Sequence, residues 1–341
     1  MKRAFQLISS AMVAASMFLA GCAQGRKLPM TTLAPKSDLA DWIYRLFIEV
    51  TLWDGLVLAI VIVAFLLAIF VFSTRVGEAA PPSSAASDLK LEVAWTVGPA
   101  LILLMITIPT IRTIFRSQPN LPPAGALEIK VVAHQWWWEF QYGDKDHVIT
   151  ANEMHIPVGV PIRLTLQSGD VIHSFWVPQL GGKRDVVPGQ LNELTFIAYV
   201  PGVYPGQCAE FCGESHANMR FRVFVDTPQQ FAEWEKGQST MPTAGAAMTD
   251  KAAARGAQVF SNSPCAACHR IDGVSKGYIG PDLSHFGSRT TMASAIEANT
   301  PANVADWIVN PGRVKPGAQM PKLGLSGTQL NDLVAYLENL K

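Results

Sequence analysis

The 341-residue sequence predicts a multidomain protein in which a two-helix transmembrane hairpin precedes an antiparallel β-sandwich and then an all-α domain. Long apolar runs early in the chain, alternating segments in the middle and helical spacing at the end predict this order. Lys+Arg and Asp+Glu are equal at 27 each, so the chain lacks the net basic field of nucleic-acid-binding proteins, and no nucleic-acid partner is expected. Charged residues make up only 16%, and the hydrophobic excess lies before Arg116. A membrane-attached front half and a soluble back half follow.

The first residues have the pattern of an export signal. Met1-Lys2-Arg3 carries positive charge and precedes a short apolar run that ends in Gly21-Cys22, as in a secretory signal peptide. Small residues before a cysteine resemble the lipobox of bacterial lipoproteins, which implies that residues 1–21 are removed and that Cys22 is lipidated. A first transmembrane helix is the alternative, and the shortness of the run argues against it. Export would place the later cysteines where free thiols are normally oxidised.

Residues 55–74 and 93–111 form two runs without a charged side chain, each close to the roughly 20 residues that span a bilayer. Buried helices of a soluble protein are the alternative, but two such runs after an export signal favour the membrane. We therefore assign residues 22–118 to an N-terminal segment and a transmembrane hairpin. An outer N-terminus and two crossings put the rest of the chain on the periplasmic or outer face of a bacterial cytoplasmic (inner) membrane.

The pattern changes after residue 118. Residues 127–133, 162–166 and 220–225 alternate apolar and polar side chains, as half-buried strands do. Turns rich in Pro and Gly separate them, which predicts an antiparallel sandwich or barrel over residues 119–237. A short helix is expected near its end, over residues 227–236.

From residue 250 the spacing of apolar residues is helical. Residues 238–249, rich in Ser, Thr, Ala and Gly, form a predicted linker to an all-α domain of residues 250–341. Helices are expected over residues 250–260, 301–309 and 326–340. The last of these has an apolar face, made by Leu330, Leu333, Val334, Leu337 and Leu340.

A cluster of soft donors lies just before the last predicted strand. Cys208 and Cys212 are four residues apart, His216 and Met219 follow, and His173 lies upstream. Thiolate, thioether and imidazole donors together favour copper. A mononuclear blue-copper site needs one cysteine, and the second permits two thiolates to bridge two copper ions. Structural zinc and a disulfide between the two cysteines are the alternatives.

The segment from Cys265 to His269, Cys-Ala-Ala-Cys-His, has the spacing of a covalent haem c attachment. Both thiols, Cys265 and Cys268, would add to haem vinyl groups while His269 coordinates the iron. A thioredoxin-like redox pair is the rival interpretation, against which the helical surroundings argue. The second axial ligand is expected to be Met320, in a Pro/Gly loop. Met292 is its competitor, in a segment that looks like a helix start.

Together these motifs resemble the CuA domain of cytochrome c oxidase subunit II. The resemblance covers the hairpin, three consecutive tryptophans and the loop Cys-x-Glu-x-Cys-x3-His-x2-Met. It implies a cupredoxin-like sandwich with a binuclear copper centre, CuA, and a magnesium ion that the Glu210 side chain reaches at the contact with subunit I. The implied copper ligands, in which Glu210 contributes its backbone carbonyl, are His173, Cys208, Glu210, Cys212, His216 and Met219.

Two further residues take roles from this resemblance. Trp136 matches the residue at which electrons enter, although adjacent tryptophans also suit a core or a membrane-interface anchor. Trp138 is expected to pack inside. Glu92 opens the second predicted span and matches the acid at the mouth of a proton pathway into subunit I, for which an interfacial charge is the alternative.

Residues 256–341 resemble a class I cytochrome c domain, with Met320 in the distal loop and residues 280–283 on the proximal side of the haem.

Subunit II fused to a cytochrome c resembles the caa-type terminal oxidases of bacteria. The implied function is electron transfer from an external cytochrome c or cytochrome bc complex, through haem c and CuA, to subunit I, where O2 is reduced to water with proton translocation. Subunits I and III and membrane lipid are the implied partners. A membrane-anchored electron-transfer or copper-delivery lipoprotein outside an oxidase is the alternative; a quinol oxidase subunit II would lack the copper ligands.

Overall fold

The computed structural model describes residues 28–71, 88–117, 123–143, 148–242 and 248–341. The chain divides into two compact units, one of residues Asp41–Pro119 and one of the residues before and after them. The predicted signal peptide, the lipidation site Cys22 and the middle of the predicted linker lie outside the described residues and stay predictions.

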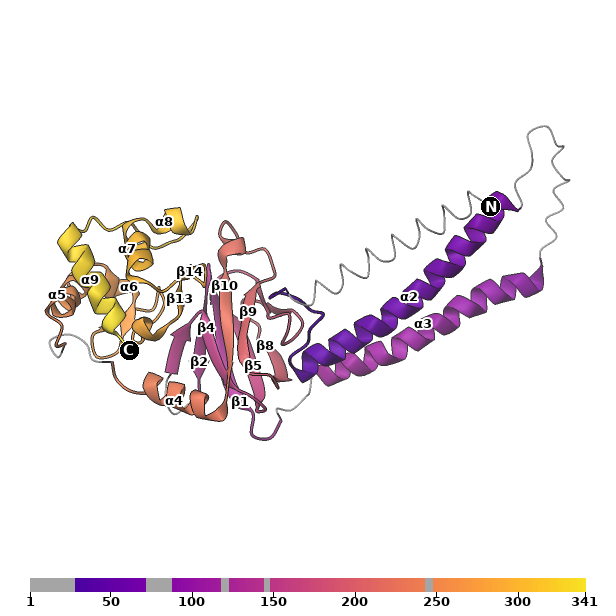
Figure 1. Cartoon of the computed structure of the whole chain (residues 1–341), viewed down its shortest axis with the longest axis horizontal. Helices are drawn as coiled ribbons and strands as arrows, with labels where there is room; N and C mark the ends of the chain where they lie inside the picture. Colours follow the sequence, from indigo (N-terminus) through magenta and orange to yellow (C-terminus); the bar gives the residue numbers. More distant parts are fainter. Residues whose placement is uncertain (1–27, 72–87, 118–122, 144–147, 243–247) are drawn as a thin grey trace, which may run out of the picture. The chain divides into compact units, whose positions relative to one another are not determined.

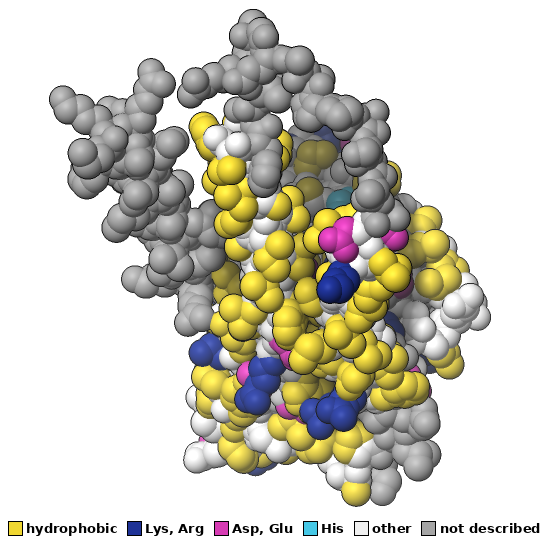
Figure 2. Space-filling view, turned by 90° about the vertical axis from the view of Figure 1, so that its right-hand side faces the viewer, with side chains coloured by type: hydrophobic (Ala, Val, Ile, Leu, Met, Phe, Trp, Pro, Cys, Tyr) yellow, Lys and Arg dark blue, Asp and Glu magenta, His cyan; other side chains and the backbone are white. Residues whose placement is uncertain are grey.

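Two long helices make up the unit of residues 41–119. These are α2 (Asp38–Phe70), whose first turn belongs to the other unit, and α3 (Leu89–Ser117). At about 1.5 Å per residue, each is longer than the roughly 30 Å of a bilayer's hydrocarbon core. Apolar side chains are exposed along both helices (Figure 2), and α3 buries none of its described side chains. Both helices are thus long and apolar enough to cross a membrane, as predicted for the two spans.

Two five-stranded sheets packed face to face form the β-domain (Figure 1). The first sheet contains, in spatial order, β3 (Val148–Ala151), β2 (Trp137–Tyr142), β1 (Leu127–His134), β5 (Pro161–Ser168) and β8 (Asn192–Ile197). The second contains, in spatial order, β4 (Glu153–Pro157), β10 (Arg220–Asp226), β9 (Gly202–Cys208), β6 (His173–Trp176) and β7 (Arg184–Val186).

Burial alternates along β5 and β10, so one face of each strand lines a shared core. Trp138 of the first sheet meets Phe175 and Phe221 of the second, with ring centroids 5.5 and 5.3 Å apart. These contacts confirm the expected sandwich and the expected packing of Trp138. The pairing of strands is mixed rather than antiparallel throughout, because β1 lies parallel to β5 and β4 lies parallel to β10. Alternation along a strand reports burial and not the direction of its neighbour.

The helix α4 (Pro228–Gln238) follows β10 and confirms the helix expected there. The Thr227 hydroxyl accepts from the backbone N–H of Gln230, and the Gln230 side chain accepts from the backbone N–H of Thr227. This capping box fixes the start of the helix. Trp234 then stacks on His155 of β4, with ring centroids 4.5 Å apart.

The C-terminal domain contains α5 (Lys251–Ser261), α6 (Cys265–Cys268), α7 (Pro301–Val309), α8 (Pro311–Val314) and α9 (Gly327–Asn339). The side chains of Asp250, Thr300 and Ser326 cap α5, α7 and α9. The helices α5 and α9 cross closely, because a Cβ at Gly256 would lie 2.0 Å from the carbonyl oxygen of Asp332. The three helices predicted from apolar spacing are confirmed.

Short strands interrupt the helical pattern of this domain. The strands β11 (Arg270–Ile271) and β12 (Ser275–Lys276) form one hairpin, and β13 (Thr291–Met292) and β14 (Glu297–Ala298) form another. Met292 therefore lies in a strand, and the helix start expected around it is wrong. Its partner strand lies only a few residues later, which the intervening Ala-Ser-Ala-Ile sequence, without Gly, Asn or Pro, did not reveal.

Candidate metal and haem sites

Sheet pairing brings the predicted metal ligands to one end of the second sheet. Cys208 is the last residue of β9, and η1 (His216–Asn218) and Met219 follow before β10. The strand β6 begins at His173 and pairs with β9. A histidine 35 residues upstream of Cys208 thereby reaches the loop that carries the two cysteines.

The ligand side chains face one another across a few ångströms. Cys208 Sγ lies 3.8 Å from both Cys212 Sγ and His173 Nδ1. On the other side, Cys212 Sγ lies 3.6 Å from His216 Nδ1 and 3.8 Å from Met219 Sδ. Each cysteine sulfur therefore lies beside a different histidine, and both cysteines are buried.

The peptide of Glu210 also faces this cluster. Its carbonyl oxygen lies 3.2 Å from Cys208 Sγ, while its side chain is exposed to solvent. The structure therefore brings all six predicted donors together, with the backbone of Glu210 directed inward and its carboxylate outward.

Asp170 fixes the ring of His173, which is fully buried. The Nε2–H of His173 donates to Asp170 Oδ1 over 2.7 Å, which leaves Nδ1 as the free acceptor on the side of Cys208. Burial opposes a charge on the ring, yet the hydrogen bond to Asp170 raises the pKa of His173 above its usual value. Asp170 also accepts from the backbone N–H of Gln135 over 2.5 Å.

The two thiols form a tightly coupled pair. A hydrogen bond from Cys212 lowers the pKa of Cys208 to about 4, and the same bond together with burial raises the pKa of Cys212. The pair therefore holds one negative charge readily and accepts a second only when a cation replaces the shared proton. The sulfurs lie 3.8 Å apart, well beyond the ~2.05 Å of a disulfide, and both cysteines are free.

The donor chemistry fits copper better than zinc. Four ligands satisfy a structural zinc ion, which would leave Met219 without a role although it is fully buried with its sulfur toward Cys212. A set of two thiols, two imidazoles, a thioether and a carbonyl is the soft mixture that copper prefers.

Trp136 lies in the turn between β1 and β2 and contacts the cysteine loop. Its indole Nε1–H donates to the carbonyl oxygen of Cys212 over 3.0 Å, and the side chain of Gln135 donates to the same oxygen over 2.7 Å. Trp136 is half-buried, in contrast to the enclosed Trp137 and Trp138. The tryptophan run therefore supplies Trp136 to the metal site and Trp138 to the core between the sheets, while Trp137 stacks on His134.

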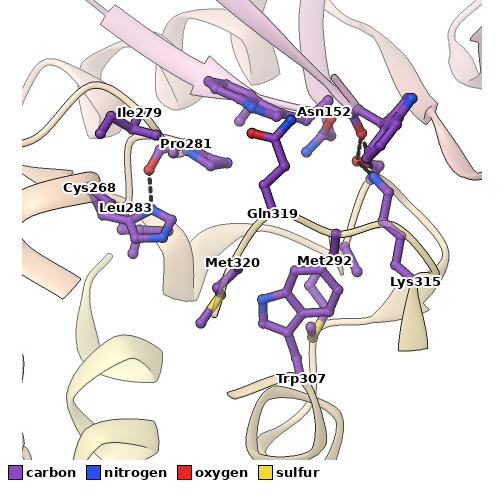
Figure 3. Close-up of a pocket in the computed structure, with 18 of the residues that line it drawn as sticks. Asn152, Cys268, Ile279, Pro281, Leu283, Met292, Trp307, Lys315, Gln319 and Met320 are labelled. Atoms are coloured by element: carbon purple, nitrogen blue, oxygen red, sulfur yellow. Dashed lines mark hydrogen bonds between the residues drawn. The ribbon is translucent and has the colours of Figure 1, made fainter. Parts of the chain in front are cut away.

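A second site is an open cavity lined by Cys265, Cys268, His269 and Met320 (Figure 3). It encloses about 1210 Å³ of empty space, the open space at its mouth included. Residues of the β-domain line the same cavity: Gln135, Trp136, Trp137, Ala151 and Asn152.

His269 is oriented for axial ligation in this cavity. Its Nδ1–H donates to the carbonyl oxygen of Pro281 over 2.8 Å (Figure 3), which leaves Nε2 free for a metal. Burial lowers the pKa of His269, so the ring stays neutral, as a ligand must. A Cβ at Gly280 would lie 2.5 Å from the ring, so Gly280 and Pro281 both contact His269.

Met320 and Met292 both line the cavity (Figure 3). Met320 is half-buried on the loop before α9, whereas Met292 belongs to the buried core of the helical domain. Arg289 lines the cavity too, and its Nε is buried without a hydrogen-bond partner among the described residues. An anionic group in the cavity would satisfy it, and a haem supplies propionates. These residues fit a haem.

Several residues at these sites were not found from the sequence. Asp170 precedes His173 by three residues, a spacing that could have indicated a hydrogen-bond partner for the ring. Arg289 and Lys315 carry no local signal of their burial beside the cavity. Glu92, the predicted proton-pathway residue, lies half-buried in the first turn of α3.

Comparisons with known proteins extend over most of the chain. Residues 40–113 match the family described as cytochrome C oxidase subunit II, transmembrane domain; residues 143–225 match its periplasmic domain; and residues 253–341 match the cytochrome c family. The periplasmic domain of subunit II of cytochrome oxidase of Bradyrhizobium japonicum, solved by crystallography, is 35% identical over 34% of this chain and 95% of that one, with a TM-score of 0.33.

Two relatives that align with nearly the whole chain show to which family the chain belongs. A cytochrome c oxidase subunit 2 of Alkalihalophilus pseudofirmus is 35% identical over 331 residues, 96% of this chain and 94% of the relative. That of Bacillus subtilis is 34% identical over 347 residues, 95% of each chain. The chain therefore belongs to the cytochrome c oxidase subunit 2 family and carries a cytochrome c domain at its C-terminal end.

Proposed function

We propose that this chain is the electron-accepting subunit II of a haem-copper terminal oxidase. Covalent haem c and a binuclear copper centre, CuA, would carry electrons one at a time from an external donor to subunit I, where O2 is reduced to water with proton translocation. The observation that carries the proposal is that one compact unit contains both donor sets, with Trp136 lining the haem cavity and bonded to the copper loop.

The residues at the copper site would hold two ions between them. Cys208 and Cys212 would bridge the ions, and His173 and His216 would each bind one. Met219 and the carbonyl oxygen of Glu210 would be the weak outer ligands. The exposed carboxylate of Glu210 is free to bind magnesium where subunit I meets this surface.

Cys265 and Cys268 would hold the haem through thioether bonds, with His269 and Met320 as axial ligands. A His/Met pair gives a higher reduction potential than other common pairs, which suits electron delivery toward oxygen. Trp136 would be the point at which electrons enter the copper site, since its indole hydrogen-bonds to the carbonyl of a copper ligand.

The membrane-spanning unit would anchor this machinery in a bacterial cytoplasmic membrane, with residues 119–341 on the periplasmic or outer face. Cys22 would add a lipid anchor after removal of residues 1–21. Glu92, at the start of α3, would lie where protons enter a pathway into subunit I. Subunits I and III would be the partners in the membrane, and a cytochrome c or cytochrome bc complex the external donor.

Metal and haem analysis of the complex purified from membranes tests the proposal. We expect two copper ions and one covalent haem c per copy of this chain, with a delocalised two-copper signal in electron paramagnetic resonance. A single zinc ion, a closed disulfide at Cys208 and Cys212, or a protein without covalent haem would contradict it.

A second test exchanges the predicted weak ligand. In Met219→Leu the buried volume is nearly kept but the thioether is lost, so the copper potential should shift and oxidation of reduced haem c should slow, with haem attachment unchanged. Met154→Leu makes the same exchange at another fully buried methionine and should leave both unchanged. Stopped-flow rates that are the same in Met219→Leu as in the natural protein would contradict the ligand assignment.

A further inference from the structure

The haem domain and the β-domain share a polar, buried interface on the side of the copper loop. One part of it is the docking hairpin, defined here as residues 290–298, which includes β13 and β14. The other part is the Met320 loop, defined here as residues 315–320. Both parts contact residues that border the copper site.

Glu153 of β4 is buried, and the docking hairpin supplies all the hydrogen bonds that its carboxylate is seen to accept. The hydroxyls of Thr290 and Thr291 donate to it over 2.6 Å each. Their backbone N–H groups donate over 3.1 and 2.7 Å. Only 3% of Glu153 is exposed. A carboxylate enclosed in this way depends on the haem domain for its partners, because undocking would remove every one of them.

Lys315 of the Met320 loop makes the matching contact at Trp136. Its Nζ donates to the carbonyl oxygen of Trp136 and to Ser294 Oγ, and Ser294 Oγ donates to the same carbonyl over 2.8 Å. Lys315 is 4% exposed. The docking hairpin and the Met320 loop therefore meet on the backbone of the residue whose indole bonds to Cys212.

The backbone of the docking hairpin is held in an unfavourable conformation at this contact. Ala293, Ser294 and Ala295 have φ of 50°, 61° and 57°, in the left-handed region that residues other than glycine rarely adopt. Such a run persists where surrounding contacts fix it. Here it aims the Ser294 hydroxyl at Trp136.

The Met320 loop also touches the copper loop directly. A Cβ at Gly317 would lie 3.1 Å from Cβ of Glu214, which stands between Cys212 and His216. One short loop thus carries the proposed iron ligand Met320, the Lys315 amine on the Trp136 carbonyl and a contact to the segment between two proposed copper ligands.

We propose that Glu153, Lys315 and Ser294 are positioning residues that latch the haem domain onto the copper domain, so that electrons pass through Trp136 in a docked state and not by free movement on the linker. The proposal rests on the function proposed above and deepens it. The latch also covers the Trp136 carbonyl, so an external donor delivers electrons to the haem domain and does not dock on Trp136.

The test uses the intact oxidase complex with Glu153→Gln and Lys315→Met. The glutamine would turn an amide NH2 toward the threonine donors, and the methionine removes the amino group at nearly constant length. Amide hydrogen exchange in residues 290–298 should speed up in both variants. Oxidation of haem c in a single turnover should slow by about tenfold, the scale on which loss of a charge-assisted hydrogen bond depopulates a state. Glu233→Gln and Lys251→Met, on exposed helix positions, are the matched controls and should behave like the natural protein.

Solvent viscosity separates docking from a general structural defect. Transfer in the natural protein should not change with added glycerol, whereas in the two variants it should slow as viscosity rises, because the domain must then find its site by diffusion. Unchanged exchange and rates in both variants would overturn the latch. Faster exchange with an unchanged rate would overturn the positioning role. If a variant folds poorly, Ser294→Ala gives the same readouts with a smaller change.

Copper and haem content distinguish this failure from failure of the proposed function. Complexes with both cofactors, normal spectra and unchanged transfer would count against the latch alone. Complexes without covalent haem or without a two-copper signal would count against the function itself.

Discussion

At the scale of single residues, the proposed copper site depends on neighbours that never touch the ions. Asp170 holds the His173 ring by its Nε2–H and also accepts from the backbone N–H of Gln135, the residue before Trp136. One carboxylate therefore sets the orientation of a copper ligand and the position of the turn that carries the tryptophan. The tryptophan in turn bonds back to the copper loop, because its indole N–H donates to the carbonyl oxygen of Cys212.

Replacing Asp170 by Asn should weaken copper binding without removing a ligand. The neutral amide accepts a weaker hydrogen bond from His173, and loss of such an outer partner typically lowers metal affinity about 10–100-fold. Competition with a copper chelator measures this affinity, and Asp185→Asn on the exposed edge of β7 is the control. Equal affinity in Asp170→Asn and the natural protein would show that the ring is oriented by packing alone.

At the scale of secondary structure, the sequence predicted most of what local chemistry determines. Asp250, Thr300 and Ser326 each cap a helix close to where periodicity placed its start, because capping and apolar spacing are both local. The clustering of the copper donors followed from loop spacing except for His173, which arrives through the pairing of β6 with β9.

The interface between the domains could not be predicted in the same way. Glu153 and Thr290 are separated by 137 positions in the chain. No sequence motif around either residue indicates that the two will meet. The strand at Met292 was missed for a related reason: its partner is reached through a left-handed run of Ala and Ser, where glycine or asparagine would have signalled the turn.

The crossing of α5 and α9 gives a prediction at this scale. In Gly256→Ala the new Cβ would lie 2.0 Å from the Asp332 carbonyl oxygen, so the helices must separate. We expect a loss of about 1–3 kcal/mol in the stability of the haem domain, seen by calorimetry as a lower Tm of its transition. Gly237→Ala is the matched control in α4, where nothing lies within 4 Å of the new Cβ, and it should be neutral or stabilise by up to about 1 kcal/mol. A haem domain in Gly256→Ala that is as stable as in the natural protein would mean that α9 has room to shift.

At the scale of the whole molecule, the order of the domains along the chain and the order of electron transfer run in opposite directions. The membrane anchor comes first, the copper domain second and the haem domain last, yet electrons would enter at the last domain and leave toward the membrane. Both soluble domains belong to one compact unit, and the haem cavity is lined by residues of each. The predicted linker of residues 238–249 therefore connects two domains that also contact each other through the hydrogen bonds of Glu153 and Lys315.

This arrangement predicts how a substitution at Trp136 changes the steady-state kinetics of the complete oxidase. Because Lys315 and Ser294 occupy the Trp136 carbonyl and the indole bonds to Cys212, we expect an external cytochrome c to dock on the haem domain. Trp136→Phe should therefore lower the maximal rate, because transfer from the haem domain to the copper site slows. The KM for soluble cytochrome c should stay within about twofold of the natural value, because the substitution leaves the surface on which the donor docks unchanged. Trp234→Phe, which packs on His155 and does not line the haem cavity, is the control for packing. A KM that rises severalfold in Trp136→Phe at an unchanged maximal rate would place the donor on the tryptophan itself, and the docked state would then have to open in every turnover.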